Sequence, residues 1–270
     1  MKKTLYLKHS GRMGDIIYCL MAVIPFARKN HFKIHFLLSS NPAWKNISNG
    51  DHPFPGMIND SNIKDLIEII SDPDLGIEAS EFVPSDLPQL GNEDRLYDMD
   101  HIKVYGSSYG LPYGDVRKWY QYAYPELNVG TNWHHYGNHA RFGASSDNEI
   151  IIVNRTKRYQ NPNILYSSLS GMKNVFFAGL DDEYEEFLYH VPNCQRISKQ
   201  FALLHIAWLI QHCKLFIGNQ SFLYSLAEYY QVPRLLEVGS PNNVIPMGRN
   251  GYDFHTQEAL EFYLKEYANS

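Results

Sequence analysis

The sequence has few cysteines and no excess of positive charge. Its 270 residues include three cysteines, Cys19, Cys194 and Cys213, which are scattered and odd in number. That usage excludes a disulfide-stabilised scaffold and is typical of a protein in a reducing compartment. With 24 lysines and arginines against 29 aspartates and glutamates, the net charge of −5 provides no global basic field for nucleic acid or an anionic membrane.

Long apolar runs are also missing. The N-terminus is basic, but Lys8, His9 and Arg12 interrupt the apolar stretch that follows it. This pattern predicts neither a signal peptide nor a membrane span, so we expect a cytoplasmic protein without a transmembrane segment.

Two kinds of cofactor signal are lacking. No G-x-G-x-x-G with a downstream acidic residue occurs, which disfavours an NAD-linked enzyme. The histidines at 134, 135 and 139 have no cysteine or acidic residue beside them, and a proline turn is the simplest explanation of Asp72-Pro73-Asp74. We therefore predict no metal and no cofactor.

The chain does contain a strand, a loop and a helix at its start. The strand 4–7 leads into a loop with Gly11 and Gly14, and a helix with apolar positions at three- and four-residue spacing begins at Asp15. This is the first turn of a Rossmann-like unit, and open α/β sheets bind ligands at this edge. Asp15 either caps the helix or serves as a functional carboxylate; capping alone would not require both glycines, which favours the functional role.

Strand and helix patterns then alternate along the chain. We expect an α/β protein with two Rossmann-like halves around a cleft, residues 1–146 and 147–270. The predicted strands are 33–38, 149–153, 174–177, 214–217 and 232–238, and the predicted helices are 63–70, 164–169, 183–189, 201–212, 222–230 and a last one capped by Thr256. The region 71–146 lacks clean periodicity, and its many tyrosines suit either irregular core packing or a surface that faces an acceptor.

Three strand ends in the second half carry polar residues that suit a nucleoside diphosphate. Arg155, Lys157 and Arg158 offer charge for a diphosphate, or form a solvated basic turn. The loop 218–221 offers backbone amides and a helix N-terminus to an anion, or simply caps its helix. Glu237 is suited to a ribose diol, or to a salt bridge with Arg234 or Arg249.

These segments, in this order, resemble the two-domain GT-B glycosyltransferases, and most of all the ADP-heptose:lipopolysaccharide heptosyltransferase family. The similar segments are Arg12–Asp15, Ala22–Pro25, Phe177–Tyr184 and Phe216–Ser221, with 226–228 and 232–233 downstream. They cover about the first forty residues and most of the chain after Glu149. Gln220, Phe222 and Ser225 stand where the family has aspartate, glycine and histidine, which leaves the donor sugar open.

The resemblance implies a nucleotide-sugar-dependent glycosyltransferase. Asp15 would be the general base that deprotonates the acceptor hydroxyl in a single inverting, metal-independent displacement. Lys157 and Arg158 would neutralise the leaving nucleoside diphosphate. The expected ligand-binding residues are Gly11, Arg12, Gly14, Arg155, Lys157, Arg158, Gly218, Asn219, Gln220, Ser221 and Glu237. The acceptor would be a cell-surface glycan or its lipid-linked precursor.

Two other functions fit the same residues. A viral enzyme that glycosylates a hydroxymethylated base in DNA would need a basic surface, for which the middle region offers Arg117, Lys118 and Arg141 among Trp119, Tyr120 and Trp133. A non-catalytic nucleotide- or glycan-binding protein would explain the altered loop at Gln220, whereas the intact Asp15 opposes it. The oligomeric state has no signal in the sequence.

Overall fold

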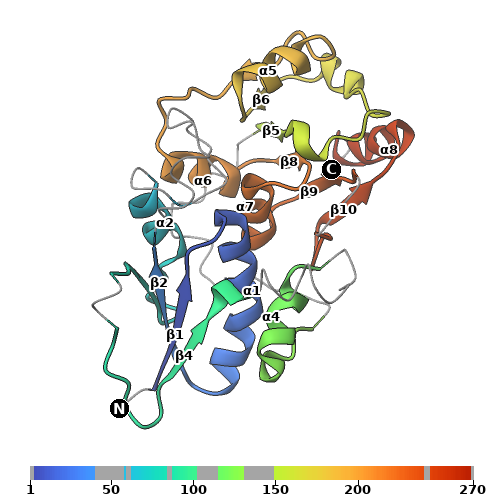
Figure 1. Ribbon diagram of the computed structural model, residues 1–270. Coiled ribbons are helices and arrows are strands. Elements are labelled where there is room, and N and C mark those ends of the chain that lie inside the picture. The colour runs from blue at the N-terminus through green and yellow to red at the C-terminus, as the bar shows by residue number, and fades with distance from the viewer. Residues whose placement is uncertain are drawn as a thin grey trace. The chain divides into compact units, whose positions relative to one another are not determined.

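The computed structural model of the protein describes residues 3–39, 58, 62–83, 87–101, 115–130, 149–239 and 244–268. The chain divides into two compact units, Met1–Asn138 and His139–Ser270 (Figure 1). Each unit is built on a parallel sheet with helices, so the predicted α/β class with two Rossmann-like halves is confirmed. The predicted boundary between residues 146 and 147 lies outside the described residues.

The first unit has a four-stranded sheet in the order β3-β2-β1-β4. Every pairing in it is parallel. Its strands are β1 (Thr4–His9), β2 (Lys33–Leu38), β3 (Ile77–Glu81) and β4 (Arg95–Asp98). The chain moves outward from β1 to β3 and then returns to the other side of β1. The direction therefore reverses between β1 and β4, which is where open α/β sheets bind ligands.

The described part of this unit has three α-helices: α1 (Met13–Lys29), α2 (Ile63–Ile70) and α4 (Arg117–Ala123). Two 3-10 helices, η3 (Met99–His101) and η4 (Pro125–Leu127), follow β4 and α4. In α1 the apolar positions Ile16, Leu20 and Ile24 are completely or almost completely buried. Full burial of such a side chain stabilises the fold by about 1.5–3 kcal/mol, so α1 is held chiefly by its packing on the sheet and on α4.

The second unit has a six-stranded parallel sheet in the order β10-β9-β8-β5-β6-β7. Its strands are β5 (Ile151–Asn154), β6 (Val175–Phe177), β7 (Gln195–Arg196), β8 (Leu215–Gly218), β9 (Arg234–Glu237) and β10 (Gly251–Phe254). Read in chain order, this is the 3-2-1-4-5-6 arrangement of the doubly wound Rossmann fold. Its direction reverses between β5 and β8.

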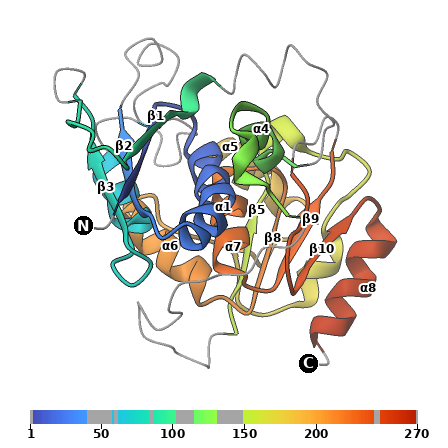
Figure 2. The same ribbon diagram turned by 90° about the horizontal axis from the view of Figure 1, so that it is seen from below.

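Helices cover both faces of this sheet. They are α5 (Asp181–Leu188), α6 (Leu203–Gln211), α7 (Phe222–Tyr230) and α8 (Gln257–Ala268), with 3-10 helices η6 (Lys157–Tyr159) and η7 (Ser167–Gly171). Figure 2 shows α8 on one side of the strands and α6 and α7 on the other. One core joins Val153 and Ile217 of the central strands to Phe187 of α5 and Leu260 of α8. Because both faces are covered, all four residues of β5 and of β8 are buried.

The predicted elements are largely confirmed, with five differences. Strands β3, β4 and β10 lie where we expected loops or irregular structure, and β7 is a two-residue strand that no pattern indicated. The helix predicted at 164–169 is wrong, because Tyr166 adopts a left-handed backbone conformation and a 3-10 helix follows it. The turn at Asp72 is confirmed, since its Oδ1 accepts hydrogen bonds from the amides of Asp74 and Leu75. None of the helices in the described ranges has the length and apolar content required to span a membrane.

Candidate functional site

The loop after β1 carries Asp15 at the point where the first sheet reverses direction. Arg12 is the N-cap of α1, and its carbonyl accepts a hydrogen bond from the Ile16 amide. Asp15 is therefore the third residue of the helix, where a carboxylate is favoured by the helix dipole. Its side chain is half-buried, whereas Arg12 is exposed and Gly11 is buried. The structure thus places Gly11, Arg12, Gly14 and Asp15 in one strand-to-helix turn.

The same loop is fixed from one side by the carboxylate of Asp100, in η3. The amide and the hydroxyl of Ser10 each donate to it, both at 2.8 Å. Asp100 thereby connects the loop after β1 to the segment after β4, across the reversal point. The Cys19 thiol, one helical turn beyond Asp15, has a pKa raised well above its usual value by burial and by the charges of Asp100 and Asp15. Cys19 is therefore a neutral thiol and not a nucleophile.

On the other side, a hydrogen-bond chain runs from the loop through His9 and Tyr120 to the helix. The Gly11 amide donates to His9 Nδ1 at 2.9 Å, and His9 Nε2 lies 3.2 Å from the Tyr120 hydroxyl. Tyr120, on α4, donates that hydroxyl to the carbonyl of Asp15 at 2.7 Å. Both side chains are almost completely buried. The sequence did not predict these hydrogen bonds, because no local pattern connects Tyr120 to His9, 111 positions away, or to Asp15, 105 positions away.

In the second unit the reversal point is formed by the ends of β5 and β8. Gly218, the last residue of β8, lies so close to β5 that an added Cβ would be 2.5 Å from the Asn154 carbonyl oxygen. Glycine is required here for space. The Asn219 side chain then accepts from the Thr156 amide at 2.9 Å and from its hydroxyl at 3.0 Å, and donates to its carbonyl at 2.7 Å. Asn219 is fully buried, so it fixes the loop after β5 and is not exposed to a ligand.

Ser221 follows in the same loop as the N-cap of α7. Its hydroxyl accepts from the Tyr224 amide at 3.0 Å, which confirms the capping alternative for this residue. Gln220 and Ser221 are both half-buried. The start of α7 directly follows Asn219, whose side chain holds Thr156, and a helix N-terminus in this position is suited to an anion.

The cations after β5 differ from one another in their surroundings. The Lys157 ammonium is half-exposed and bonds to Asp182 at 2.7 Å, with Glu186 at 3.8 Å. The hydrogen bond to Asp182 raises the pKa of Lys157. Arg158 is exposed and its guanidinium lies over the Tyr159 ring at 4.8 Å; no carboxylate of the described residues is within ion-pair distance of it.

Glu183 connects this loop to α5. Its two carboxylate oxygens accept from the amides of Lys157 at 3.1 Å and Leu180 at 2.9 Å. The second bond satisfies the amide of Leu180, the N-cap residue of α5, whose own apolar side chain makes no capping hydrogen bond. Burial raises the pKa of Glu183 even though these amides oppose the shift. Glu183, in the segment Phe177–Tyr184 that resembles the heptosyltransferases, thus makes a structural contact with the loop after β5.

The ligand-binding roles expected for Arg155 and Glu237 are corrected. Arg155 donates to Glu237 from Nε at 2.8 Å and from Nη2 at 3.0 Å, and both side chains are buried. The Tyr166 hydroxyl and the Asn161 amide also donate to Glu237, at 2.7 Å and 2.5 Å. Neither residue has a free charge to offer a ligand. The salt bridge considered as the other role of Glu237 is present, but its partner is Arg155 and neither Arg234, which pairs with Glu228, nor Arg249.

The basic surface considered for DNA is also corrected. Arg117 is 1% exposed, and its guanidinium pairs with Asp115 at 3.1 Å. Tyr120 is buried in the chain described above. Trp133, Arg141 and the three histidines lie outside the described residues. In the parts that the structure describes, no group of three or more His, Cys, Asp or Glu side chains is arranged to hold a metal ion.

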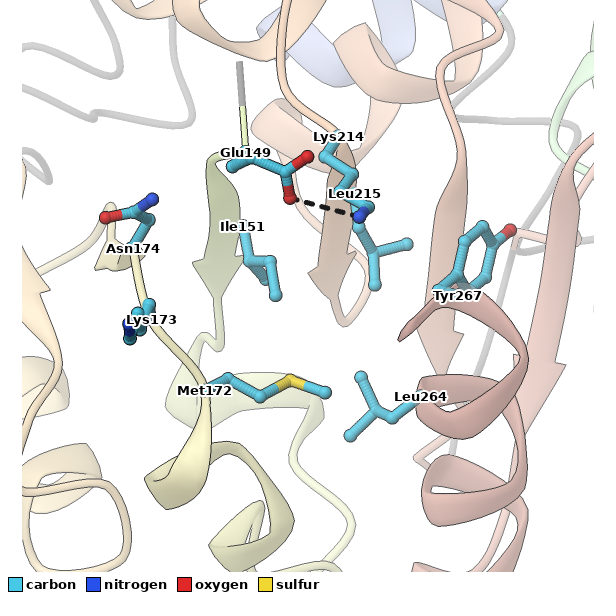
Figure 3. Close-up of a pocket in the computed structure, with 9 residues that line it drawn as sticks. All are labelled: Glu149, Ile151, Met172, Lys173, Asn174, Lys214, Leu215, Leu264 and Tyr267. Carbon is cyan, nitrogen blue, oxygen red and sulfur yellow. Dashed lines mark hydrogen bonds and ion pairs between the residues drawn. The ribbon is translucent and has the colours of Figure 1, made fainter. Parts of the chain in front are cut away.

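A pocket of about 320 Å³ lies at the opposite edge of the second sheet (Figure 3). Ile151 and Leu215, at the amino-terminal ends of β5 and β8, line it together with Met172 and Leu264. Lys214 bonds to Glu149 at its rim, at 3.1 Å. The predicted ligand residues all follow the carboxyl ends of strands, so this pocket is not part of the candidate site.

Comparison with solved structures identifies the fold. The chain is similar to the iron-containing dodecameric glycosyltransferase TibC of enterotoxigenic E. coli, with 15% identity over 93% of this chain and a TM-score of 0.55. It spans 62% of the length of TibC. E. coli heptosyltransferase WaaC with ADP-2-deoxy-2-fluoro heptose matches 99% of this chain and 100% of its own at 12% identity and a TM-score of 0.52.

A family 9 glycosyltransferase of Veillonella parvula matches 98% of this chain and 90% of its own, at 12% identity and a TM-score of 0.51. Searches of the sequence against protein-family models and curated proteins find no match. At these identities the likeness establishes the fold, which is that of the GT-B glycosyltransferases and resembles the heptosyltransferases.

Proposed function

We propose that this protein is a glycosyltransferase that moves a sugar from a nucleotide-sugar donor to an acceptor hydroxyl. The observation that carries the proposal is the set of groups in the two strand-to-helix turns, each of which lies where the strand order of its sheet reverses. One turn holds a half-buried carboxylate, and the other holds helix amides beside exposed cations. Both occur in a fold that resembles enzymes described with ADP and ADP-heptose analogues.

Asp15 acts as the general base in this proposal. Its carboxylate takes the proton of the acceptor hydroxyl, whose oxygen then attacks the anomeric carbon while the nucleoside diphosphate leaves from the opposite face, so the configuration inverts. General-base catalysis of this kind contributes about 10²–10⁴-fold to a rate. The fixed loop supports the role, because Asp100 and His9 hold the amides of Ser10 and Gly11 at the start of the turn and Tyr120 holds the Asp15 carbonyl at its end.

The second unit binds the donor. The amides at Gln220 and Ser221 donate hydrogen bonds to phosphate oxygens at the start of α7, and Arg158 and Lys157 offset the charge of the leaving diphosphate. Lys157 must then exchange its contact with Asp182 for the diphosphate. The predicted residues Gly218 and Asn219 shape the loop rather than bind, and Gly11, Arg12 and Gly14 position Asp15. We further propose that the domain boundary lies between residues 146 and 147 and that the protein is cytoplasmic. Its acceptor in this proposal is a cell-surface glycan or the lipid-linked precursor of one.

A thermal-shift screen against nucleoside diphosphates and nucleotide sugars, with ADP-heptose among them, tests the donor site. A ligand at a hundredfold excess over its Kd stabilises the native state by about 2.7 kcal/mol. A shift with one nucleotide supports the proposal and names its base. No shift with any of them favours a non-catalytic glycan-binding protein. Transfer that persists in a chelator supports the metal-independent step, and transfer lost in a chelator and restored by iron refutes it.

Asp15→Asn tests the general base, and the chain offers a matched control. Asp65 is the third residue of α2, as Asp15 is of α1, so Asp65→Asn removes the same charge from the same helix position in the same unit. Each change costs about 0.3–1 kcal/mol of helix-dipole stabilisation. We expect Asp15→Asn alone to lower kcat by about 10²–10⁴-fold with nucleotide affinity unchanged. Equal kcat in the two variants, or lost nucleotide binding in a folded Asp15→Asn, contradicts the assignment.

A further inference from the structure

The hydrogen-bond chain through His9 and Tyr120 ends on the backbone of the proposed catalytic base. Tyr120 contacts the Asp15 carbonyl, which lies in the first turn of α1, and not the carboxylate. His9 joins the same tyrosine to the amide of Gly11, four residues earlier in the same loop. The two side chains thus connect the beginning and the end of the turn that carries Asp15.

The directions of the three hydrogen bonds are mutually consistent. The Gly11 amide is a donor, so His9 Nδ1 is unprotonated and the ring proton lies on Nε2. Nε2–H then donates to the Tyr120 oxygen, and the Tyr120 hydroxyl proton is donated to the Asp15 carbonyl. Burial raises the pKa of Tyr120 well above its usual value, with smaller effects of Cys19, Asp15 and Asp100. The tyrosine therefore keeps the proton that it donates.

The hydrogen-bond chain through His9 and Tyr120 is also closed to water. His9 is 2% exposed and Tyr120 is 1% exposed, and α4 packs directly against α1. Hydrogen bonds in such surroundings are costly to leave unmade, which gives the chain a defined geometry.

We propose that His9 and Tyr120 are positioning residues: they set the place and direction of the Asp15 carboxylate toward the acceptor hydroxyl. The inference rests on the proposed function, because it needs Asp15 to act on an acceptor. A displacement of about 1 Å of a reacting group lowers a rate by up to about 10²-fold. Loss of the chain then lowers kcat and leaves nucleotide binding in the second unit unchanged.

Tyr120→Phe tests the inference, with Tyr124→Phe as its control. Tyr124 is the C-cap residue of α4, and its hydroxyl also donates to a backbone carbonyl, that of Asp98, at 2.9 Å. Each variant loses one hydroxyl that bonds to a carbonyl of the first unit, but the two carbonyls belong to different elements. We expect Tyr120→Phe to lower kcat by about 10–100-fold, with donor KM within twofold of the wild type, and Tyr124→Phe to retain the wild-type kcat.

His9→Asn tests the same chain from its other end. The asparagine oxygen can replace Nδ1 as the acceptor for Gly11, but the side chain is too short to reach Tyr120. If the hydrogen-bond chain acts as a unit, the double variant with Tyr120→Phe should have the same kcat as the slower of the two single variants. Effects on kcat that multiply in the double variant overturn the inference.

A readout independent of turnover separates this inference from the proposed function. NMR titration of the Asp15 carboxyl should show a changed pKa in Tyr120→Phe and the wild-type pKa in Tyr124→Phe, because only the first moves the turn. An unchanged Asp15 pKa, equal kcat in the two phenylalanine variants, or joint loss of kcat and nucleotide binding in Tyr120→Phe overturns the positioning role. A wild-type chain that transfers no sugar, while Asp15 titrates as expected, refutes the proposed function alone.

Discussion

Replacement of Glu237 by glutamine separates a structural ion pair from a ligand-binding carboxylate. All four groups around the carboxylate are donors: Arg155 Nε and the Tyr166 hydroxyl on one oxygen, and Arg155 Nη2 and the Asn161 amide on the other. Turned toward Arg155 Nη2 and the Asn161 amide, the glutamine NH2 finds no acceptor; turned the other way it can donate to the Tyr166 hydroxyl but still faces the Nε–H of Arg155. In either orientation one N–H of Arg155 loses its acceptor. The Arg155 guanidinium also loses its counter-charge in a buried site.

The expected cost follows from that burial. Glu237 is completely buried and the Arg155 side chain is 7% exposed. Removing one partner of a buried ion pair costs about 3–5 kcal/mol, which for a domain of this size lowers Tm by on the order of 10 °C. Burial alone would lower the pKa of Arg155, but its hydrogen bonds to Glu237 and the charge of Glu237 outweigh that effect and raise it. The variant therefore keeps the burial of the arginine and loses the carboxylate that compensates for it.

Urea denaturation followed by circular dichroism measures the loss, and Glu149→Gln is the control. Glu149 pairs with Lys214 at 3.1 Å, but its side chain is 70% exposed, so its loss should cost no more than about 1 kcal/mol. Equal free energies of unfolding in the two variants would refute the reasoning. Weakened nucleotide binding in Glu237→Gln at unchanged stability would restore the ligand role that the sequence suggested.

Two further predictions concern the second unit. Gly218→Ala should destabilise the protein by about 1–3 kcal/mol and lower its nucleotide affinity, because the added Cβ would lie 2.5 Å from the Asn154 carbonyl oxygen. Gly171→Ala, whose Cβ would have nothing within 4 Å, should change neither; urea denaturation and thermal shift measure both variants, and equal results would contradict the packing argument. Glu183 has a pKa raised above its unfolded value near 4.5, so it binds more protons when folded and its contribution to stability falls as pH rises from about 4.5 through the folded pKa. Glu183→Gln should remove that part of the slope in unfolding measurements between pH 4 and 7, and an unchanged slope would show that the carboxylate is not desolvated.

The sequence predicted the fold best for elements whose start, end and apolar pattern can all be read within the element itself. The helix at 222–230 and the strand at 33–38 have the predicted bounds, because caps and apolar patterns lie within the segment itself. Strands β3 and β4 were missed because each pairs along one edge only within the described residues and carries polar residues, such as Glu78 and Asp98, at half-buried or exposed positions. Their strand state is imposed by β1 and β2 and not by their own composition.

For the candidate site, the sequence predicted the strand-to-helix turns that hold Asp15 and the loop 218–221, but not the contacts of the side chains within them. Strand ends are readable from hydrophobic runs, so Asp15 and the loop 218–221 were found. Whether a charged residue after a strand is exposed depends on partners far away in sequence. Arg155 meets Glu237 across 82 positions, and Asn219 meets Thr156 across 63, and neither spacing leaves a local signal.

The contact between Asn219 and Thr156 makes the loops after β5 and β8 a single cooperative unit. One side chain occupies the amide, the carbonyl and the hydroxyl of Thr156, and thus supplies the hydrogen bonds that a neighbouring strand would otherwise provide beyond the end of the sheet. The Thr156 amide can exchange its proton with water only when this contact opens. Because the contact is buried between the two central strands, that opening is an event of the whole sheet and not of one loop.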